Sequence, residues 1–220
     1  MASTSSSKTP YRQIRALYDS STITVYQAYS AEIATAAVQH QKLDASPAYK
    51  TGSRMTWIKP SWAWVLYRSG YSYKDERQTN ILAIKMTHKA FNDLLEKAVL
   101  SHGEELRKSK EKAKKEGREK TADVRVQWDP ERSFMMEKLE YRSIQIGIPG
   151  SLVKEWVDGI VSIEDVTERA RELKRVVDED SEEKTGLEEL INKGLVPFEQ
   201  EFVVSDRLRE ILKMHEVDSA

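Results

Sequence analysis

Residues 54–71 have the sequence RMTWIKPSWAWVLYRSGY, and this stretch contains the junction on which the fold depends. Residues 54–59 have the β-branched and aromatic content typical of a strand. Pro60 is suited to the first turn of a helix, and Gly70 to the position just after its last turn. A helix that begins directly after a strand presents free backbone N–H groups, which can bind an anion. We therefore predict a strand–helix junction whose free amides, near Ser61, lie beside a small anion-binding region.

The same stretch alternates aromatic rings with cations. Three of the five tryptophans of the chain lie in it. Cations beside aromatic faces favour planar, anionic ligands, because bases stack on rings and phosphates pair with Arg and Lys. A buried strand and helix whose long cationic side chains reach the surface would give the same spacing. The spacing leaves both interpretations open for the residues concerned, which are Arg54, Trp57, Lys59, Trp62, Trp64, Tyr67 and Arg68.

Composition favours a single domain with a short tail. The 220 residues carry a net charge of −1, so binding to nucleic acid or to a membrane would need a local patch. The absence of cysteine excludes disulfides, thiolate zinc sites and a cysteine nucleophile, and it fits a reducing compartment. No apolar run approaches the length of a membrane span, and the polar start lacks the apolar core of a secretory signal. We expect a flexible tail at 1–10, one catalytic domain at 11–220 and a cytoplasmic location.

Strands and helices mix along the chain without a regular βαβ repeat. We predict strands at 22–29, 54–59, 81–86, 124–128, 141–148, 160–163 and 196–204. We predict helices at 31–43, 60–70, 88–102, 151–159, 164–177, 187–191 and 206–215. This arrangement favours an α+β fold, with a mixed, mostly antiparallel sheet flanked by helices.

Two charged segments cannot pack as core. Residues 103–122 form a basic insertion, and within it residues 107–120 hold eight cations, three acids and no large apolar residue. This composition predicts either a solvated helix extension or an arm that follows a phosphate backbone. Residues 178–185 predict a solvated acidic loop.

Familiar catalytic motifs are absent from the sequence. It contains no GxxxxGK[ST], no GxGxxG after a strand, no HExxH and no GxSxG. The four histidines are scattered on or beside predicted helices, and no acidic cluster has metal-ligand spacing. We therefore expect neither a metal nor a cofactor, and a substrate that arrives already activated would need neither.

Polar residues also interrupt three of the predicted strands. Gln27, Gln127 and Gln145 are amides within apolar strands, where they need hydrogen-bond partners. Ladders between strands would supply such partners, and so would a ligand pocket. Strand alternation assigns the residues of the 141–148 strand to two faces, Arg142, Ile144 and Ile146 on one and Ser143, Gln145 and Gly147 on the other.

Five motifs, in order within residues 11–170, carry a resemblance to a known family. They are YRQIRALY (11–18), TITVYQAYS (22–30), RMTWIKPSWAWVLYRSGY (54–71), VRVQWDPER (124–132) and YRSIQIG (141–147). Together they resemble a bacterial and fungal family described only as a domain of unknown function. The fungal arginine-containing cyclodipeptide synthases of secondary metabolism are identified as members of that family. They make cyclo-Arg-Xaa diketopiperazines from aminoacyl-tRNAs, so the resemblance implies a tRNA-binding transferase that forms peptide bonds.

The resemblance implies a set of roles for the polar residues. Arginyl-tRNA and a second aminoacyl-tRNA would be the partners, and no cofactor would be needed because an aminoacyl ester is already activated. The arginyl guanidinium would pair with Asp129 or Glu131, or else with Glu164 or Asp165. A carboxylate or the Tyr26 phenol would take the proton of the attacking α-amine. An acyl group would pass through Ser61 or Ser143, or one ester would be attacked directly.

The candidate residues follow from these roles. Those with a catalytic role are Tyr26, Lys59, Ser61, Asp129, Glu131 and Arg142, of which Lys59 and Arg142 would stabilise the oxyanion. Those that would bind substrate are Arg12, Arg15, Gln27, Tyr29, Arg54, Trp57, Trp62, Tyr67, Arg68, Gln127, Arg132 and Gln145.

Two other functional classes stay open. The strand–helix–strand order of residues 22–87 loosely resembles an ADP-ribosyltransferase core, in which NAD would stack on the tryptophans and Glu131 would stabilise the oxocarbenium ion. The usual His/Tyr/Glu signature is not legible, because Tyr26 stands at a first-strand position without a histidine beside it. A non-catalytic RNA-binding module would use the same aromatic and basic residues without turnover.

Overall fold

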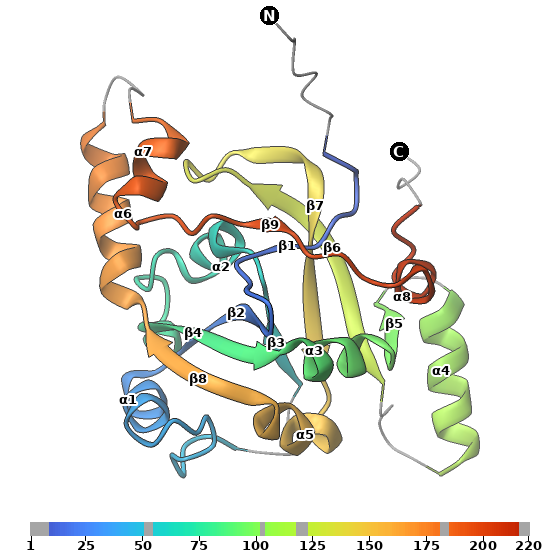
Figure 1. Ribbon diagram of the computed structural model, residues 1–220. Coiled ribbons are helices and arrows are strands. Elements are labelled where there is room, and N and C mark those ends of the chain that lie inside the picture. Colours follow the sequence, from blue (N-terminus) through green and yellow to red (C-terminus); the bar gives the residue numbers. More distant parts are fainter. Residues whose placement is uncertain (1–8, 51–54, 102–103, 118–122, 181–184, 216–220) are drawn as a thin grey trace, which may run out of the picture.

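The computed structural model of this protein describes residues 9–50, 55–101, 104–117, 123–180 and 185–215. They form the α+β fold that the sequence predicts, and most of the strand pairs are antiparallel (Figure 1). The first sheet has the order β2–β4–β8, formed by Thr22–Tyr29, Asn80–Thr87 and Ile160–Asp165. The second has the order β3–β7–β6–β5, formed by Thr56–Ile58, Lys138–Ile148, Val124–Arg132 and Ala98–Leu100. A short ribbon pairs β1 (Arg15–Ala16) with β9 (Gln200–Glu201).

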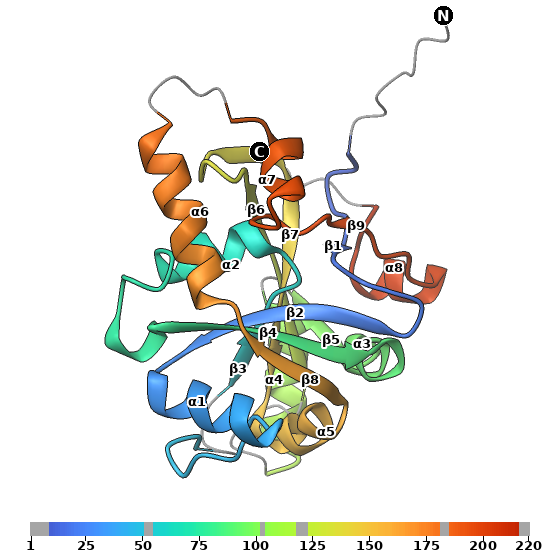
Figure 2. The ribbon, with the colours of Figure 1, turned by 60° about the vertical axis from the view of Figure 1, so that its left-hand side comes forward.

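Helices cover both faces of the three-stranded sheet (Figure 2). Helices α1 and α5 lie on one side of it, and α2 and α6 lie on the other. Among the described residues, no helix combines the length and the apolar character needed to cross a membrane. The helices are α1 (Ala31–His40), α2 (Trp62–Ser69), α3 (His88–Leu95), α4 (Glu104–Lys115), α5 (Val153–Asp158), α6 (Thr167–Glu179), α7 (Leu187–Asn192) and α8 (Asp206–Ile211), with the 3-10 turns η1 (Glu76–Gln78) and η2 (Gly150–Leu152).

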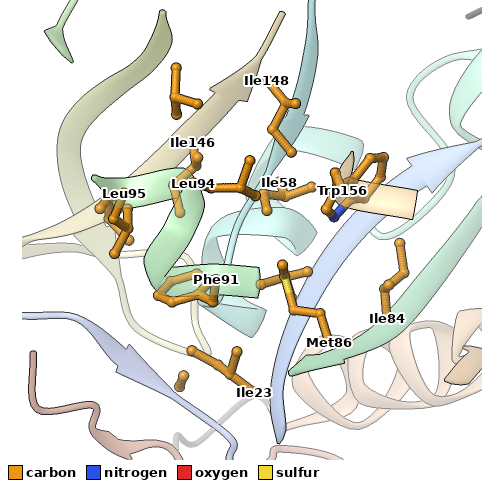
Figure 3. Packing of buried hydrophobic residues seen from close by; sticks show 14 of the residues in the cluster. Ile23, Ile58, Ile84, Met86, Phe91, Leu94, Leu95, Ile146, Ile148 and Trp156 are labelled. Atoms are coloured by element: carbon orange, nitrogen blue, oxygen red, sulfur yellow. The ribbon is translucent and has the colours of Figure 1, made fainter. Parts of the chain in front are cut away.

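The main core lies between the two sheets. Along β2 and β4, alternate residues such as Val25 and Ile84 are fully buried and point toward the second sheet. They meet Ile146 of β7, and Phe91 of α3 and Trp156 of α5 close the ends of the cluster (Figure 3). A smaller core on the other face of the first sheet packs β2 and β4 against α2, α6 and α7.

A backbone bridge between Tyr26 and Lys59 links the two sheets. The Tyr26 N–H donates to the Lys59 carbonyl at 2.6 Å, and the Lys59 N–H donates to the Tyr26 carbonyl at 3.2 Å. This bridge joins β2, at the edge of the first sheet, to the chain just after β3, at the edge of the second. Lys59 is therefore fixed at the joint between the sheets.

Some element boundaries differ from the predicted ones. The helix expected at 88–102 ends at Leu95, because Ala98–Leu100 pairs in parallel with β6 instead. Strand β6 does not stop before Asp129–Pro130 but runs on to Arg132. Pro130 is tolerated there because β5 pairs only with the first part of β6, which leaves one side of Pro130 without a partner strand. The strand expected at 196–204 is reduced to the two residues of β9.

Three predicted segments lie partly outside the described residues. Of the 1–10 tail only residues 9–10 are described, and of the 178–185 loop residues 181–184 are not. Within the 103–122 insertion, α4 is a helix that stands beside β5 at the periphery (Figure 1). Its described cations are exposed, as expected of a segment that cannot pack as core.

Candidate functional site

One face of the four-stranded sheet is polar. In β7, Ile144 and Ile146 are buried in the main core, so Ser143 and Gln145 point to the opposite face, as strand alternation predicts. On that face the Gln145 amide donates to Gln127 Oε1 of β6 at 2.9 Å. The predicted amide ladder is thus confirmed for this pair, and the same face continues into a pocket.

Trp57 lies flat across β7 because its cross-strand partner is Gly147. A Cβ atom added at Gly147 would stand 2.8 Å from two carbons of the Trp57 ring and 2.8 Å from Met55 Sδ. No side chain at position 147 is compatible with this ring position. Glycine therefore allows the indole to form a wall above the strand.

This wall belongs to a cavity of about 540 Å³, here called the cationic pocket. It lies among β2, β3, β7, α2 and η1, and none of its lining residues is acidic. A volume of this size is typical of small-molecule sites. The lining residues are Gln27, Ala28, Met55, Thr56, Trp57, Lys59, Val65, Arg68, Ser69, Arg77, Gln78 and Gln145.

Lys59 is the most unusual residue of the cationic pocket. It is only 8% exposed, and within the described part of the chain its ammonium has neither a hydrogen bond nor an ion pair. Burial and, to a smaller extent, the charge of Arg68 lower the pKa of Lys59, Asp129 acts in the opposite direction, and the resulting pKa is about 8. A buried ammonium without a direct partner is costly, and an anionic ligand would offset that cost.

Gln27 contributes an amide to the opposite wall. Its Nε2 donates to Thr56 Oγ1 at 2.6 Å. Its Oε1 is buried and has no hydrogen-bond partner among the described residues. The pocket therefore combines cations with an acceptor that is not used by the protein.

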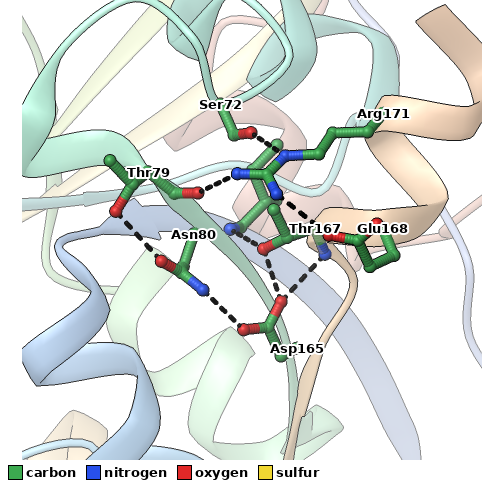
Figure 4. A network of polar contacts seen from close by, with 8 residues as sticks. Ser72, Thr79, Asn80, Asp165, Thr167, Glu168 and Arg171 are labelled. Atoms are coloured by element: carbon green, nitrogen blue, oxygen red, sulfur yellow. Dashed lines mark hydrogen bonds and ion pairs between the residues drawn. The ribbon is translucent and has the colours of Figure 1, made fainter. Parts of the chain in front are cut away.

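The loop from Gly70 to Thr79 brings Arg77 and Gln78 to the pocket. Its backbone begins in the left-handed region, with φ of 56° at Gly70, 55° at Tyr71 and 77° at Ser72. Two of these residues carry side chains, so the turn needs support from outside. Arg171 of α6 gives it, because its guanidinium donates to Ser72 Oγ at 3.1 Å and to the Thr79 carbonyl at 3.4 Å (Figure 4).

Replacing Arg171 by alanine should loosen this loop. The change removes the two hydrogen bonds to the loop and the contact of the guanidinium with the Tyr73 ring, at 5.3 Å from its centroid, together with an exposed ion pair to Glu168 on α6 itself. Amide hydrogen exchange in residues 73–79 should accelerate about tenfold, as expected from a loss of about 1–1.5 kcal/mol. Arg175→Ala is the matched control, because Arg175 contacts only Glu172 and Glu179 of its own helix among the described residues. Equal exchange in both variants would show that Arg171 does not hold the loop.

The N-terminus of α2 carries a buried polar chain. Ser61 caps the helix by accepting from the Trp64 N–H at 3.1 Å, and it donates to Glu131 Oε1 at 2.9 Å. Glu131 also accepts from the Arg132 N–H at 2.8 Å. Burial raises the pKa of Glu131 above its ordinary value, although these hydrogen bonds act to lower it. Ser61 is 1% exposed and Glu131 is 4% exposed, so neither is presented to a ligand in the cationic pocket.

Three of the expected site residues are core residues. Tyr26 is 1% exposed, and burial raises the pKa of its phenol far above the usual range, so it is corrected from a candidate base to a packing residue. Trp62 is 2% exposed, and its indole N–H donates to the Leu195 carbonyl at 3.1 Å, so it is not available for stacking. Tyr29 packs in the main core against Tyr49. Tyr26 and Trp62 therefore do not face the cationic pocket, whereas the buried Tyr29 hydroxyl lies near Thr56 and Gln27, two residues that line it.

Other expected site residues lie away from the cationic pocket. The Arg142 guanidinium donates to the Tyr11 hydroxyl at 2.7 Å, on the face of β7 opposite to Gln145. Arg12 donates to the Lys213 carbonyl at 2.9 Å. Arg15 lines a second cavity. Arg142 and Arg12 thus tie the ends of the described chain together, rather than facing the pocket.

Tyr67 is exposed, but its ring is already engaged. It stacks on Trp64 with the centroids 5.3 Å apart, and the Arg132 guanidinium lies 4.0 Å from its centroid. The carboxylates considered as second choices for a guanidinium are also occupied, since Glu164 pairs with Arg169 and Asp165 caps α6 through the Thr167 N–H. Arg54 lies outside the described residues.

The structure thus brings Gln27, Trp57, Lys59, Arg68 and Gln145 around one pocket, with Asp129 close enough to act on the Lys59 charge. Sequence reasoning missed Arg77 and Gln78, because their loop carries no periodic pattern and is positioned by Arg171 from a distant helix. It also missed Glu199, which lines the second cavity. No group of three or more His, Asp or Glu side chains that could hold a metal ion occurs among the residues that the structure describes.

Comparison with known proteins gives a family but no activity. The profile of the family described as "Domain of unknown function (DUF4291)" matches residues 13–202. No curated protein matches the chain. The function therefore has to be argued from the pocket itself.

Proposed function

Because the chain belongs to the family described as a domain of unknown function (DUF4291), whose description assigns no reaction, we propose its function from the cationic pocket. We propose that the protein is an aminoacyl-tRNA-dependent peptide-bond-forming enzyme that makes arginine-containing cyclic dipeptides. In this proposal the cationic pocket takes the 3′-terminal nucleotide of the tRNA. The expected compartment is the cytoplasm, where its substrates are charged.

The observation that carries the proposal is Lys59, a largely buried lysine beside Arg68 whose ammonium has no hydrogen bond or ion pair among the described residues. Both cations line a pocket whose lining includes no acidic residue, which favours a ligand with phosphate or another anionic group. Trp57 supplies an indole wall on which a base can stack. Gln27 and Gln145 supply amides that can bond the edge of that base.

The pKa of Lys59 suits the proposed reaction. It is lowered to about 8, close to the value of about 7.7–8.0 for an α-amino group. A proton can therefore pass between the attacking amine and the Lys59 side chain with little free-energy change. In its charged form Lys59 can also stabilise an oxyanion, the role expected from the sequence.

The chemistry needs no external activator. The α-amine of one aminoacyl group attacks the ester carbonyl carbon of the other, so that a C–N bond forms and the ester C–O bond to the ribose breaks. The ribose oxygen takes the proton, and the first tRNA is released. The free α-amine of the dipeptidyl ester then attacks the remaining ester carbonyl in the same way, which closes the six-membered ring and releases the second tRNA.

Helix α4 gives a second surface for RNA. Arg107, Lys108, Lys112, Lys114 and Lys115 are exposed on it, and the helix lies next to β5 at the edge of the sheet that carries the pocket. Surface cations in such an arrangement bind a phosphate backbone without reading sequence. These exposed cations support the proposal that the anionic ligand is part of an RNA.

An assay with charged tRNA tests the proposal. The protein is incubated with tRNA, the aminoacyl-tRNA synthetases, ATP and all amino acids, and the products are analysed by mass spectrometry. We expect diketopiperazines that contain arginine, and we expect ribonuclease to abolish them. Consumption of NAD without a cyclic dipeptide would favour the ADP-ribosyltransferase interpretation instead. Tight tRNA binding without any turnover would favour an RNA-binding module.

A further inference from the structure

A second cavity, of about 360 Å³, lies on another side of α2. It is enclosed by α2, α6, α7 and the hairpin between β6 and β7, and most of its walls are hydrocarbon. The side chains that form these walls include Trp62, Leu66, Phe134, Leu139, Leu173 and Ile191. We call this cavity the Glu199 pocket, after the carboxylate that lines it.

Glu199 reaches the N-terminus of α2. Its Oε1 accepts from the Trp62 N–H at 2.7 Å, and among the described residues its carboxylate has no ion pair. Burial and, to a smaller extent, the charge of Glu131 raise the pKa of Glu199 to about 8, against the lowering effects of the Trp62 hydrogen bond and of Arg15. The cavity is therefore lined by a carboxylate that holds a proton at neutral pH while the cavity is empty.

The arginines near this carboxylate do not pair with it directly. Arg15 acts on both Glu131 and Glu199, but its guanidinium donates to the Glu199 carbonyl at 2.7 Å and to Gln13 Oε1 at 3.2 Å rather than to either carboxylate. Arg132 also lines the cavity, but its guanidinium lies over Tyr67 and donates to the Met136 carbonyl. Neither arginine that lines the cavity thus pairs directly with the Glu199 carboxylate, so a cation bound in the cavity would be its charge partner once Glu199 loses its proton.

We propose that the Glu199 pocket binds a monovalent organic cation that carries a hydrocarbon stem, with its charged head against the Glu199 carboxylate and its stem along the apolar walls. A guanidinium head fits best, because it is weakly hydrated and presents two parallel N–H groups to a carboxylate. The stem buries apolar surface that the empty cavity leaves open.

The side chain of arginine belongs to this ligand class. If the proposed function holds, the Glu199 pocket becomes the subsite for the arginyl side chain, in place of Asp129. That link rests on the proposed function, whereas binding of the cation to the pocket does not. A titration without tRNA therefore tests the pocket by itself.

The probe is n-butylguanidinium, titrated into the full-length protein by isothermal titration calorimetry. We expect binding below about 10 mM, the range accessible to a fragment of this size. Affinity should rise about tenfold per pH unit up to pH 8, because the bound cation displaces one proton. Titrations in buffers of different ionisation enthalpy should show about one proton released per cation bound at pH 7. n-Butanol and butanoate, which have similar stems, should bind at least tenfold more weakly.

Glu199→Gln should remove the proton release and weaken binding at least tenfold, since the amide retains an oxygen for the Trp62 N–H but carries no charge. Glu188→Gln is the matched control, because Glu188 is exposed on α7 and does not line the cavity. Ile191→Trp, which fills the cavity from α7, should abolish binding if Glu199→Gln does not fold. The proposal is overturned if butylguanidinium fails to bind the wild type, if butanoate binds more tightly, or if Glu199→Gln binds as the wild type does.

Discussion

Lys59→Met should abolish cyclic dipeptide formation while leaving the protein as stable as the wild type, or more stable. The ammonium is the buried cation of the cationic pocket, so its loss removes both the anion contact and the proposed proton carrier. Product formation should fall at least about 100-fold, the size of effect seen when a transition-state donor is removed. Methionine has a similar length and no charge to desolvate, so the fold should retain its packing.

The stability side of this prediction follows from the sign of the pKa shift. Lys59 titrates near 10.5 when unfolded and near 8 in the folded protein, so folding releases a proton between these values. In the wild type, stability should therefore rise as pH increases from 8 to 10.5, and the cost of the buried charge should be fully present below pH 8. The shift corresponds to about 3 kcal/mol, so Lys59→Met should be stabilised by up to that amount at pH 7.

Lys85→Met is the matched control for both measurements. Lys85 also lies on a strand, but it is exposed on β4 and does not line the pocket. Chemical denaturation and product formation should both match the wild type. A Lys59→Met protein that retains activity would remove Lys59 from the site, and one that is strongly destabilised would show that the ammonium has a stabilising partner.

Gly147→Ala should displace the indole wall of the cationic pocket. The added methyl group would stand 2.8 Å from the Trp57 ring and from Met55 Sδ, so both side chains must move. We expect tRNA affinity to fall about tenfold or more, because stacking on one aromatic side chain contributes about 1–3 kcal/mol. The cost in folding free energy should be about 1–3 kcal/mol, typical of overpacking. Tryptophan fluorescence should report the displaced ring.

Gly186→Ala provides the comparison for this substitution. A Cβ atom at Gly186 meets nothing within 4 Å, and its φ of −78° suits any residue. This variant should be neutral or slightly stabilised, because alanine lowers the entropy of the unfolded chain. If Gly147→Ala binds tRNA as well as Gly186→Ala does, Trp57 is not part of the binding surface.

The sequence predicted the class of the fold and part of the junction at residues 54–71. The helix begins at Trp62 rather than at Pro60, and the Trp62 N–H, expected to be free for an anion, is bound by Glu199. The predicted strand, the cap at Ser61 and the helix end at Gly70 all follow from local rules, because each depends on neighbours within four residues. The sequence also predicted which residues of β7 share a face, since side chains alternate between only two faces of a strand. The break between α3 and β5 was not, because it depends on pairing with β6, which lies more than twenty residues later in the sequence.

The candidate site was predictable only in part, and for a physical reason. Trp57, Lys59 and Arg68 are close in sequence, so the local strand–helix junction is enough to bring them to one pocket. Trp62 and Tyr26 have the same chemistry as aromatic residues that could line the cationic pocket, but α6 and α7 bury them. The sequence around Glu199 does not mark it as a candidate site residue. Its raised pKa depends partly on Glu131 and its hydrogen bond on the start of α2, and both are distant in the sequence. Composition can identify residues able to bind a ligand, whereas burial decides which of them do so.

The hydrogen bonds between Tyr26 and Lys59 have a mechanical consequence. They bridge the backbones of the two sheets. Lys59, one of the two bridged residues, also lines the cationic pocket. A ligand in this pocket would contact both Gln27 of β2 and Trp57 of β3, and so would hold the two bridged strands together. We therefore expect ligand binding to stabilise this contact between the sheets, so that the angle between them reports occupancy of the pocket.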